Sequence, residues 1–538
     1  MAAPKGTSFL TVLAVLAVLV FSASLTPAAA QTVIFVDASA TGAGGGSSWA
    51  DAYTAVQPAL NAAQPGDQVW VAAGTYVENI TLALGVGLYG GFAGTEDPAT
   101  FNLADRHLTA NQTILDGNRN GSVVTSPSGA TNNTRIDGFT IRNGSGPYGG
   151  GIHCDSSSPT IANDTVTGNA TSYVGGGVYL HNSSPTVVNT TVANNFAFRE
   201  GGGMYLHSAS ATMDKVRISG NFAECGGGLF VGYSTCTITD STIADNRAAA
   251  TAPVGGLVAG GGLYSVESAP TIANCRISNN AVLGNQFHEN DGGGLCLVLS
   301  PAVIANNTLT GNSAPRFGGG MYVKYSSAII VNNTVTGNRA IQGGGCFSYS
   351  AAPAAVDNLM AFNSSGVHRI DGTLTLRHNC VFGNDEYNYS GFHSDPTGTD
   401  GNISVDPRFV QTPDPGPDGV WGTPDDDPGD VHLLPGSPGI DAGDNAYAFG
   451  DFDLDGLPRI AWCNVDIGAH EYPGPFGDFF GDCDVDLEDY ALLEVCLRFS
   501  GPDALPPFDE CLEVFDFDLD FDVDLTDFAV FQLVFTHP

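Results

Sequence analysis

Three consecutive glycines followed by a short apolar segment recur eight times in this chain, and the recurrence limits what the chain can fold into. The triplets begin at Gly149, Gly175, Gly201, Gly226, Gly260, Gly292, Gly318 and Gly343, with steps of 26, 26, 25, 34, 32, 26 and 25 residues. Twenty residues after each first glycine stands an asparagine: Asn169, Asn195, Asn221, Asn246, Asn280, Asn312, Asn338 and Asn363. Such a period indicates a solenoid, in which each repeat buries its apolar side chains against its neighbours.

Each repeat also has the composition of β-strands. Residues 185–192 and 327–335 are rich in β-branched side chains and alternate apolar with small polar residues. One repeat is therefore predicted to form one coil of a right-handed, single-stranded parallel β-helix, with coils ~4.8 Å apart. The equal offsets stack the asparagines, so we expect an asparagine ladder in a turn, where asparagine adopts left-handed backbone angles and its amide bonds to the next coil.

The alternation along each strand separates inward from outward side chains. A predicted core column stands three residues after each first glycine: Ile152, Val178, Met204, Leu229, Leu263, Leu295, Met321 and Cys346. The next position points outward and is mostly aromatic, and five of its members are candidate carbohydrate-binding residues: Tyr179, Tyr205, Phe230, Tyr264 and Tyr322. Aromatic faces stack on sugar rings. A ladder of rings that pack only on one another, or a subunit contact, explains the same pattern equally well.

The first thirty residues have the pattern of a secretory signal peptide. Lys5 precedes an apolar run at residues 9–21, and small residues at 28–30 predict cleavage before Gln31. No later stretch is long and apolar enough for a transmembrane segment. The mature chain is expected to be secreted, either extracellular or at the cell surface.

The charge of the chain restricts its partners. With 56 acidic and 18 basic residues, the net charge of -38 argues against nucleic acid and anionic membranes and favours cations. Seven cysteines lie in the repeats and are expected to be mostly buried, small apolar side chains: Cys154, Cys225, Cys236, Cys275, Cys296, Cys346 and Cys380.

The ends of the repeat region are predicted to be capped. Residues 31–130 are assigned to an N-terminal cap with the first coils, and residues 131–384 to the β-helix repeats. Apolar residues spaced three and four apart from Trp49 to Leu60 predict a short amphipathic helix. A helix at this end would cover the apolar edge of the first coil.

The two longest insertions in the repeat favour a binding groove at one edge of the solenoid. They span residues 247–259 and 281–291, in adjacent coils beside the aromatic column. The candidate catalytic residues are His288, Glu289 and Asp291 in the second loop and Glu200 and Glu224 in nearby short turns. Carboxylates with a histidine can perform general acid and base chemistry on a sugar. Solvated loop charges are the alternative interpretation.

Several stretches resemble known families. Residues 66–76 and 88–92 resemble the opening coils of bacterial pectate-lyase-like β-helix proteins. The glycine-triplet repeats resemble those of chlamydial polymorphic outer-membrane proteins and their planctomycete relatives, over residues 33–384. The resemblance implies the β-helix fold. Lyases of this fold use an Arg or Lys base and acidic residues that hold calcium, and Arg135, Arg142 and Lys324 do not form such a set in the sequence.

Residues 385–472 are predicted to form a C-terminal cap. The stretches at 406–409, 436–444 and 466–472 resemble the choice-of-anchor module that closes many bacterial β-helix proteins. Between them, residues 451–456 are spaced like the start of a calcium loop, but no late glutamate follows.

The last segment, residues 473–538, has the ligand spacing of EF-hand loops. One loop offers five carboxylates for calcium, namely Asp516, Asp518, Asp520, Asp524 and Asp527, and an upstream copy offers Asp478, Asp482, Asp486 and Asp489. Two such units, each with an apolar helix, resemble a dockerin type I domain, which implies Ca²⁺ and a cohesin-like or cell-surface receptor. The upstream site is doubtful as a ligand set, because Phe480 replaces one ligand and Cys483 replaces the turn glycine. Cys496 and Cys511 lie between the units and could pair as a disulfide.

Two functions fit this sequence. The first, which the sequence favours, is an exported non-catalytic β-helix scaffold that binds extracellular polysaccharide or matrix and carries a calcium-binding attachment module. Its support is the scarcity of basic residues and the uniformity of the outer columns. The alternative is a polysaccharide-degrading enzyme, a pectate-lyase-like lyase or a glycoside hydrolase, with a dockerin-like assembly tag. The paired long loops favour that alternative.

Overall fold

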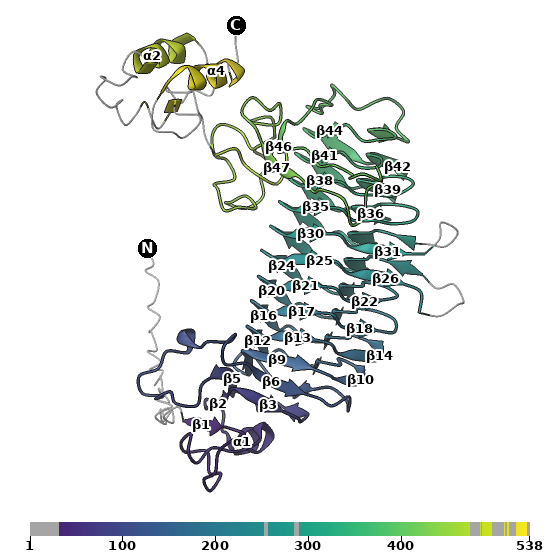
Figure 1. Ribbon diagram of the computed structural model, residues 1–538. Helices are drawn as coiled ribbons and strands as arrows, with labels where there is room; N and C mark the ends of the chain where they lie inside the picture. Colours follow the sequence, from purple (N-terminus) through teal and green to yellow (C-terminus); the bar gives the residue numbers. More distant parts are fainter. Residues whose placement is uncertain are drawn as a thin grey trace, which may run out of the picture.

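The protein is a solenoid of stacked coils (Figure 1). The computed structural model describes residues 32–251, 257–284, 290–473, 485, 487–497, 511, 514–515 and 523–534. Three parallel sheets, one of 13 strands and two of 12, run along the solenoid, and each coil adds one strand to each sheet. The predicted right-handed parallel β-helix is confirmed.

The sheet that follows the glycine triplets, called here the triplet sheet, positions the aromatic column. Its strands are β4 (Ile80–Thr81), β7 (Val124–Ser126), β11 (Ile152–Asp155), β15 (Val178–His181), β19 (Met204–His207), β23 (Leu229–Gly232), β28 (Leu263–Val266), β33 (Leu295–Val298), β36 (Met321–Lys324), β39 (Cys346–Ala351), β42 (Val367–Gly372) and β45 (Tyr389–Ser390). The predicted core column pairs coil to coil in register, and its members are at most 2% exposed.

The other two long sheets complete each coil. In the coil after Gly175 they contribute β16 (Thr186–Val188) and β17 (Thr191–Ala193), which pair with β20 (Thr212–Asp214) and β21 (Arg217–Ser219) of the next coil. A short six-stranded sheet precedes the triplets and consists of β10 (Ser145–Tyr148), β14 (Ala170–Val174), β18 (Phe196–Ala197), β22 (Phe222–Ala223), β26 (Arg247–Ala249) and β31 (Ala281–Leu283).

Backbone geometry explains the glycine triplets. The first glycine of every triplet has a positive φ, between 56° and 72°, which side chains disfavour. The third glycine lies where coils approach closely. A Cβ on Gly203 would stand 2.6 Å from the carbonyl oxygen of Gly228 and 2.9 Å from Nδ2 of Asn221. The triplet therefore combines a left-handed turn with space for the next coil.

The predicted asparagine ladder is confirmed, with one correction. Each ladder asparagine donates its side-chain amide to the Oδ1 of the next, from Asn169 through to Asn384. The left-handed backbone expected at the ladder lies one residue earlier, as at Asn194 with φ 55°. A second ladder, which the sequence analysis missed, runs from Asn307 through Asn333, Asn358 and Asn379 to Asn402.

The N-terminal helix is shorter than predicted. Helix α1 is Val56–Ala62 and buries Val56 and Leu60 against the first coils. The carboxylate of Glu78 accepts hydrogen bonds from the backbone N–H groups of Val56 and Gln57 at 2.7 and 3.1 Å, and this cap sets the start of the helix. Trp49 instead packs on Phe35, with ring centroids 4.7 Å apart.

The C-terminal segment, residues 385–473, covers the flank of the last coils. Its strands β46 (Phe409–Gln411) and β47 (Asp430–Leu433) are antiparallel. The backbone N–H of Ala469 donates to Oγ1 of Thr334, and that of Gly468 donates to the carbonyl oxygen of Asp357, both at 2.9 Å. The segment predicted as an end cap therefore contacts the side of the solenoid.

Two predictions about cysteines are confirmed. All seven cysteines of the repeats are buried, and Cys496 and Cys511 form a disulfide. The helices of the last segment include α2 (Leu487–Leu497) and α4 (Leu525–Val534). Within the described part of the chain, no helix has the length and apolar character needed to cross a membrane.

Candidate functional site on the aromatic surface

The predicted aromatic column forms a row on the outer face of the triplet sheet, which Cys296 interrupts between Tyr264 and Tyr322. The rings of Tyr179 and Tyr205 are parallel within 1°, with centroids 5.5 Å apart. Phe230 lies 5.0 Å from Tyr205, and Tyr264 lies 5.6 Å from Phe230. Because equivalent residues of successive coils are paired in register, their rings stack along the solenoid axis.

The expectation that the whole row faces solvent is wrong. Phe230, Tyr264 and Tyr322 are only 6%, 7% and 4% exposed. The residues just before the triplets, including Cys225 and Ala259, pack against these rings and cover them. Tyr179 and Tyr205 are half-buried. The prediction of sugar stacking therefore depends on the first two tyrosines.

Two further tyrosines extend the exposed part of the row. Tyr148 at the end of β10 and Tyr173 in β14 are 40% and 45% exposed. The ring of Tyr148 lies 5.3 Å from that of Tyr179 and 5.7 Å from that of Tyr173. Sequence reasoning missed both because it followed only the strands after the triplets. The position of Tyr148 directly before the first glycine triplet was the signal in the sequence that could have identified it. Tyr148, Tyr173, Tyr179 and Tyr205 are called here the aromatic surface.

Glu200 lies at the edge of the aromatic surface. It stands directly before Gly201 and pairs with Val174 on one side and Cys225 on the other. Burial raises the pKa of Glu200, the positive charge of Arg199 opposes that shift, and the negative charge of Glu224 adds to it. The pKa of Tyr205 is raised mainly by burial and, to a smaller extent, by the negative charge of Glu200. A carboxyl that keeps its proton to higher pH is suited to donate it.

The other predicted catalytic residues lie in different environments. Glu224 accepts hydrogen bonds from the backbone N–H and the hydroxyl of Thr251, at 3.1 and 2.7 Å. Asp291 is buried and forms two hydrogen bonds with Arg316, at 2.9 and 2.6 Å, so it is an ion pair rather than a solvated loop charge. His288 and Glu289 lie outside the described residues. The structure thus places Glu200 and Glu224 in neighbouring coils and gives Asp291 a separate partner.

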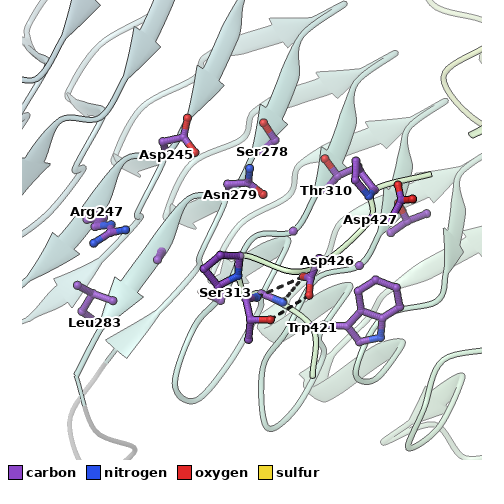
Figure 2. Close-up of a pocket in the computed structure, with 18 residues that line it drawn as sticks. Asp245, Arg247, Ser278, Asn279, Leu283, Thr310, Ser313, Trp421, Asp426 and Asp427 are labelled. Carbon is purple, nitrogen blue, oxygen red and sulfur yellow. Dashed lines mark hydrogen bonds between the residues drawn. The ribbon is translucent and has the colours of Figure 1, made fainter. Parts of the chain in front are cut away.

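A groove of about 690 Å³ opens elsewhere, where residues 421–428 cross a corner of the solenoid (Figure 2). Arg247, which begins the first long insertion, and Leu283, the third residue of the second, line one side of it. Asp426 lies opposite, but its carboxylate accepts hydrogen bonds from the backbone N–H groups of Gly422 and Thr423, at 2.6 and 3.3 Å. None of the five predicted aromatic residues belongs to the described lining. The long insertions therefore border a groove, but away from the aromatic row.

The predicted calcium ligands are described only in part. Asp489 and Asp527 lie in the first turns of α2 and α4 and are 1% and 0% exposed. Oδ2 of Asp527 accepts a hydrogen bond from the backbone N–H of Asp524 at 2.7 Å. The remaining ligands lie outside the described residues: Asp478, Asp482, Asp486, Asp516, Asp518 and Asp520. Calcium binding stays a prediction.

Comparisons with known proteins concern the solenoid. Residues 176–405 match the family model described as the right-handed beta helix region, and residues 41–225 match that of a protein of unknown function (DUF1565). No curated protein matches the chain.

Among solved structures, the pectate lyase Pel9A shares 15% identity and a TM-score of 0.43, with 82% of this chain and 96% of that chain covered. The complex of XylC with xylose shares 10% identity and a TM-score of 0.40, with 81% and 98% covered. The PL6 family alginate lyase AlyGC shares 14% identity and a TM-score of 0.25, with 68% and 53% covered. Together with the all-parallel sheets, the match to the first family model identifies the solenoid as a right-handed parallel β-helix.

Proposed function

We propose that the protein binds an extracellular polysaccharide on the aromatic surface and degrades it there, with Glu200 as the general acid. The supporting observation is the position of Glu200, a carboxyl whose pKa is raised by burial, beside Tyr205 and its exposed neighbours. Stacking rings and a proton donor are two elements that cleavage of a glycosidic bond requires.

Binding depends on the rigidity of the solenoid. Tyr179 and Tyr205 are held by paired strands, and Tyr148 and Tyr173 by the short sheet beside them. The apolar faces of sugar rings pack on such aromatic side chains, and little side-chain entropy is lost because the rings already stack on one another. A polysaccharide chain, which repeats its sugar rings, suits a surface that repeats its aromatic rings.

Cleavage needs a proton for the departing glycosidic oxygen. Glu200 supplies it, because its carboxyl stays protonated to higher pH than an exposed glutamate. Glu224 in the next coil is the neighbouring carboxylate, and it is the candidate to activate water in a hydrolase. In a lyase, a base must instead remove the proton next to the carboxylate of a uronate. Arg199 is the candidate base, because its guanidinium lies 5.9 Å from the centroid of the Tyr173 ring in the aromatic surface.

A non-catalytic scaffold is the second candidate. Asp291 is paired with Arg316, and Glu224 is hydrogen-bonded to Thr251. Of the predicted catalytic residues that the structure describes, Glu200 is then the one acid without such a role, and a single acid favours binding without catalysis. In this case the aromatic surface would retain a polysaccharide without turnover.

The last segment is proposed to attach the secreted protein through calcium. Asp489 and Asp527, the final residues of the two predicted loops, are buried at the starts of apolar helices, where position twelve of a calcium loop is expected. A cohesin-like or cell-surface receptor is the proposed partner. The net charge of -38 supports a partnership with cations rather than with nucleic acid.

An activity screen of residues 31–538 with Ca²⁺ tests the proposal. Unsaturated products and new reducing ends are followed over a panel of acidic and neutral polysaccharides. Unsaturated product on a uronate polymer would identify a lyase, and reducing ends without it would identify a hydrolase. Retention on a polymer in a pull-down without any product would favour the scaffold. Neither turnover nor retention on any polymer would contradict both candidates.

A further inference from the structure

Two histidines and an aspartate from three separate stretches of the C-terminal segment meet on its surface. Nε2 of His432, in β47, lies 2.7 Å from Oδ2 of Asp455, and Nδ1 of His470 lies 2.8 Å from the same oxygen. The two imidazole rings are 4.2 Å apart. His470 is buried, whereas His432 and Asp455 are 47% and 34% exposed at their side chains.

These three side chains present ligand atoms to one point. One nitrogen from each histidine and one carboxylate oxygen all lie within 4.8 Å of one another. Ligands at ~2.0–2.2 Å from a zinc ion in tetrahedral geometry are ~3.3–3.6 Å apart. The two nitrogen–oxygen distances of 2.7 and 2.8 Å would therefore each lengthen by ~0.5–0.9 Å when the ion binds. His432 and Asp455 are exposed enough to make that movement, and their exposure leaves the remaining coordination position open to water.

The surroundings hold the ligands in orientation. Nδ1 of His432 is hydrogen-bonded to Asp430, which fixes the ring with Nε2 toward Asp455. A carboxylate on the far nitrogen of a ligating histidine is the usual second partner in metal sites. Oδ1 of Asp455 accepts a hydrogen bond from Arg276 in β30 (Arg276–Ser278) at 2.8 Å, leaving Oδ2 for the histidines. The backbone N–H of Asp455 donates to Asp453.

We propose that His432 Nε2, His470 Nδ1 and Asp455 Oδ2 form a binding site for a borderline divalent transition-metal ion such as Zn²⁺, with Asp430 orienting His432. Imidazole nitrogens and one carboxylate suit this class of ion, whereas Ca²⁺ prefers oxygen ligands alone. The site is separate from the aromatic surface and from the two EF-hand-like loops of residues 473–538, but Asp455 belongs to the 451–456 stretch that is spaced like the start of a calcium loop.

A metal ion here would join parts of the chain that are distant in sequence. It would tie β47 to the loop containing Asp455 and to the end of the segment at His470. Through Arg276, which contacts Asp455, it would also couple the segment to the flank of the solenoid. A ligand that binds only the folded state stabilises that state. We therefore expect Zn²⁺ to raise the unfolding temperature of the protein.

Zinc titration of residues 31–538 by calorimetry tests this site, with saturating Ca²⁺ present to fill oxygen-ligand sites. We expect one zinc site, and Co²⁺ in its place should show the visible absorption of a four- or five-coordinate ion. His432→Gln and His470→Ala should each weaken zinc binding more than ~100-fold, since loss of a second partner alone costs ~10–100-fold. Asp430→Asn should weaken it by that smaller, ~10–100-fold factor.

Matched variants separate this site from surface binding. His393→Ala removes an exposed histidine elsewhere, and His181→Ala removes a half-buried histidine that is hydrogen-bonded to a single aspartate, Asp155. Both should keep the zinc affinity. If His470→Ala fails to fold, His432→Gln at the half-exposed position decides the outcome. Unchanged zinc binding in a folded His432→Gln protein, or no zinc binding by the parent chain, would overturn the proposal.

Discussion

The side-chain amide and the backbone N–H of Asn195 both donate to Oδ1 of Asn221, at 3.1 and 3.0 Å. One buried oxygen thus satisfies two buried donors of the coil before it. Asn221→Leu should lower the free energy of unfolding by at least about 2 kcal/mol, because unsatisfied buried donors cost about 1–3 kcal/mol each. Urea unfolding measures the loss. Asn133→Leu, at an exposed asparagine, is the control and should change stability little.

Glycines at two different turns of the solenoid should differ in their tolerance of a methyl group. A Cβ on Gly203 meets the carbonyl oxygen of Gly228 at 2.6 Å, so Gly203→Ala requires the backbone to shift and should cost about 1–3 kcal/mol or more. Gly168 has φ 65°, and a Cβ added there would have no atom within 4 Å, so Gly168→Ala should cost only the left-handed strain of about 1 kcal/mol. Thermal unfolding compares the two. Equal losses would contradict the role assigned to close approach.

Loss of two stacked rings should reduce retention on a polysaccharide. The double variant Tyr179→Ala with Tyr205→Ala removes neighbouring faces of the aromatic surface, each worth about 0.5–1.5 kcal/mol. We expect affinity to fall about tenfold in affinity electrophoresis on the polymer identified by the screen. Tyr447→Ala, at an exposed tyrosine of the C-terminal segment, should leave affinity unchanged. A double variant that binds like the parent would exclude the aromatic surface as the binding site.

Turnover should depend on protonation of Glu200. Because its pKa is raised, the acid form persists to higher pH, and the rate should fall as pH rises through that pKa. Glu200→Gln should lower kcat by ~10²–10⁴-fold and remove this limb of the pH profile. Glu267→Gln, at an exposed glutamate bonded to Tyr233, serves as the control. An unaltered profile in Glu200→Gln would remove Glu200 from the mechanism.

The C-terminal segment should lose stability as pH rises. In this segment the guanidinium of the buried Arg459 lies 3.1 Å from the carboxylate of Glu471. Burial raises the pKa of Asp466, and of Asp357 in the solenoid beneath the segment, to about 7. A carboxyl with a raised pKa in the folded state contributes stability that is complete below its unfolded pKa of ~4 and lost as pH rises through the folded value. Unfolding measured by calorimetry should therefore occur at lower temperature at pH 8 than at pH 5.

Substitution of one of these carboxyls checks the cause. Asp357→Asn keeps an oxygen for the backbone N–H of Asp444, which donates to Asp357 Oδ1 at 2.9 Å, and removes one titrating group. Its unfolding temperature should depend less on pH across this window. If the unfolding temperature of Asp357→Asn depends on pH as strongly as that of the parent protein, other carboxyls cause the pH dependence.

The candidate site could be predicted only in part. The aromatic column was correctly assigned to the outer face of its sheet, because strand alternation fixes the direction of each side chain. The exposure of each ring was not predictable, because it depends on the path of the turn before each triplet. Cys225 and Ala259 in such turns cover the later rings, whereas Tyr179 in an earlier coil stays partly exposed. The pairing of Asp291 with Arg316 escaped prediction for the same reason, because it joins the turns of two coils.

The sequence by itself determined the repeating coil. The period of the glycine triplets and ladder asparagines set the register, and the register set the core column from Ile152 to Cys346. These features follow from local spacing, because every coil is related to the next by the same backbone pairing. Only the tertiary structure decided which rings are covered, how Glu200 comes to lie beside Tyr205, and that His432, Asp455 and His470 meet. Those contacts arise where irregular turns and a non-repeating segment fold over the coils, and no sequence period relates the residues that they bring together.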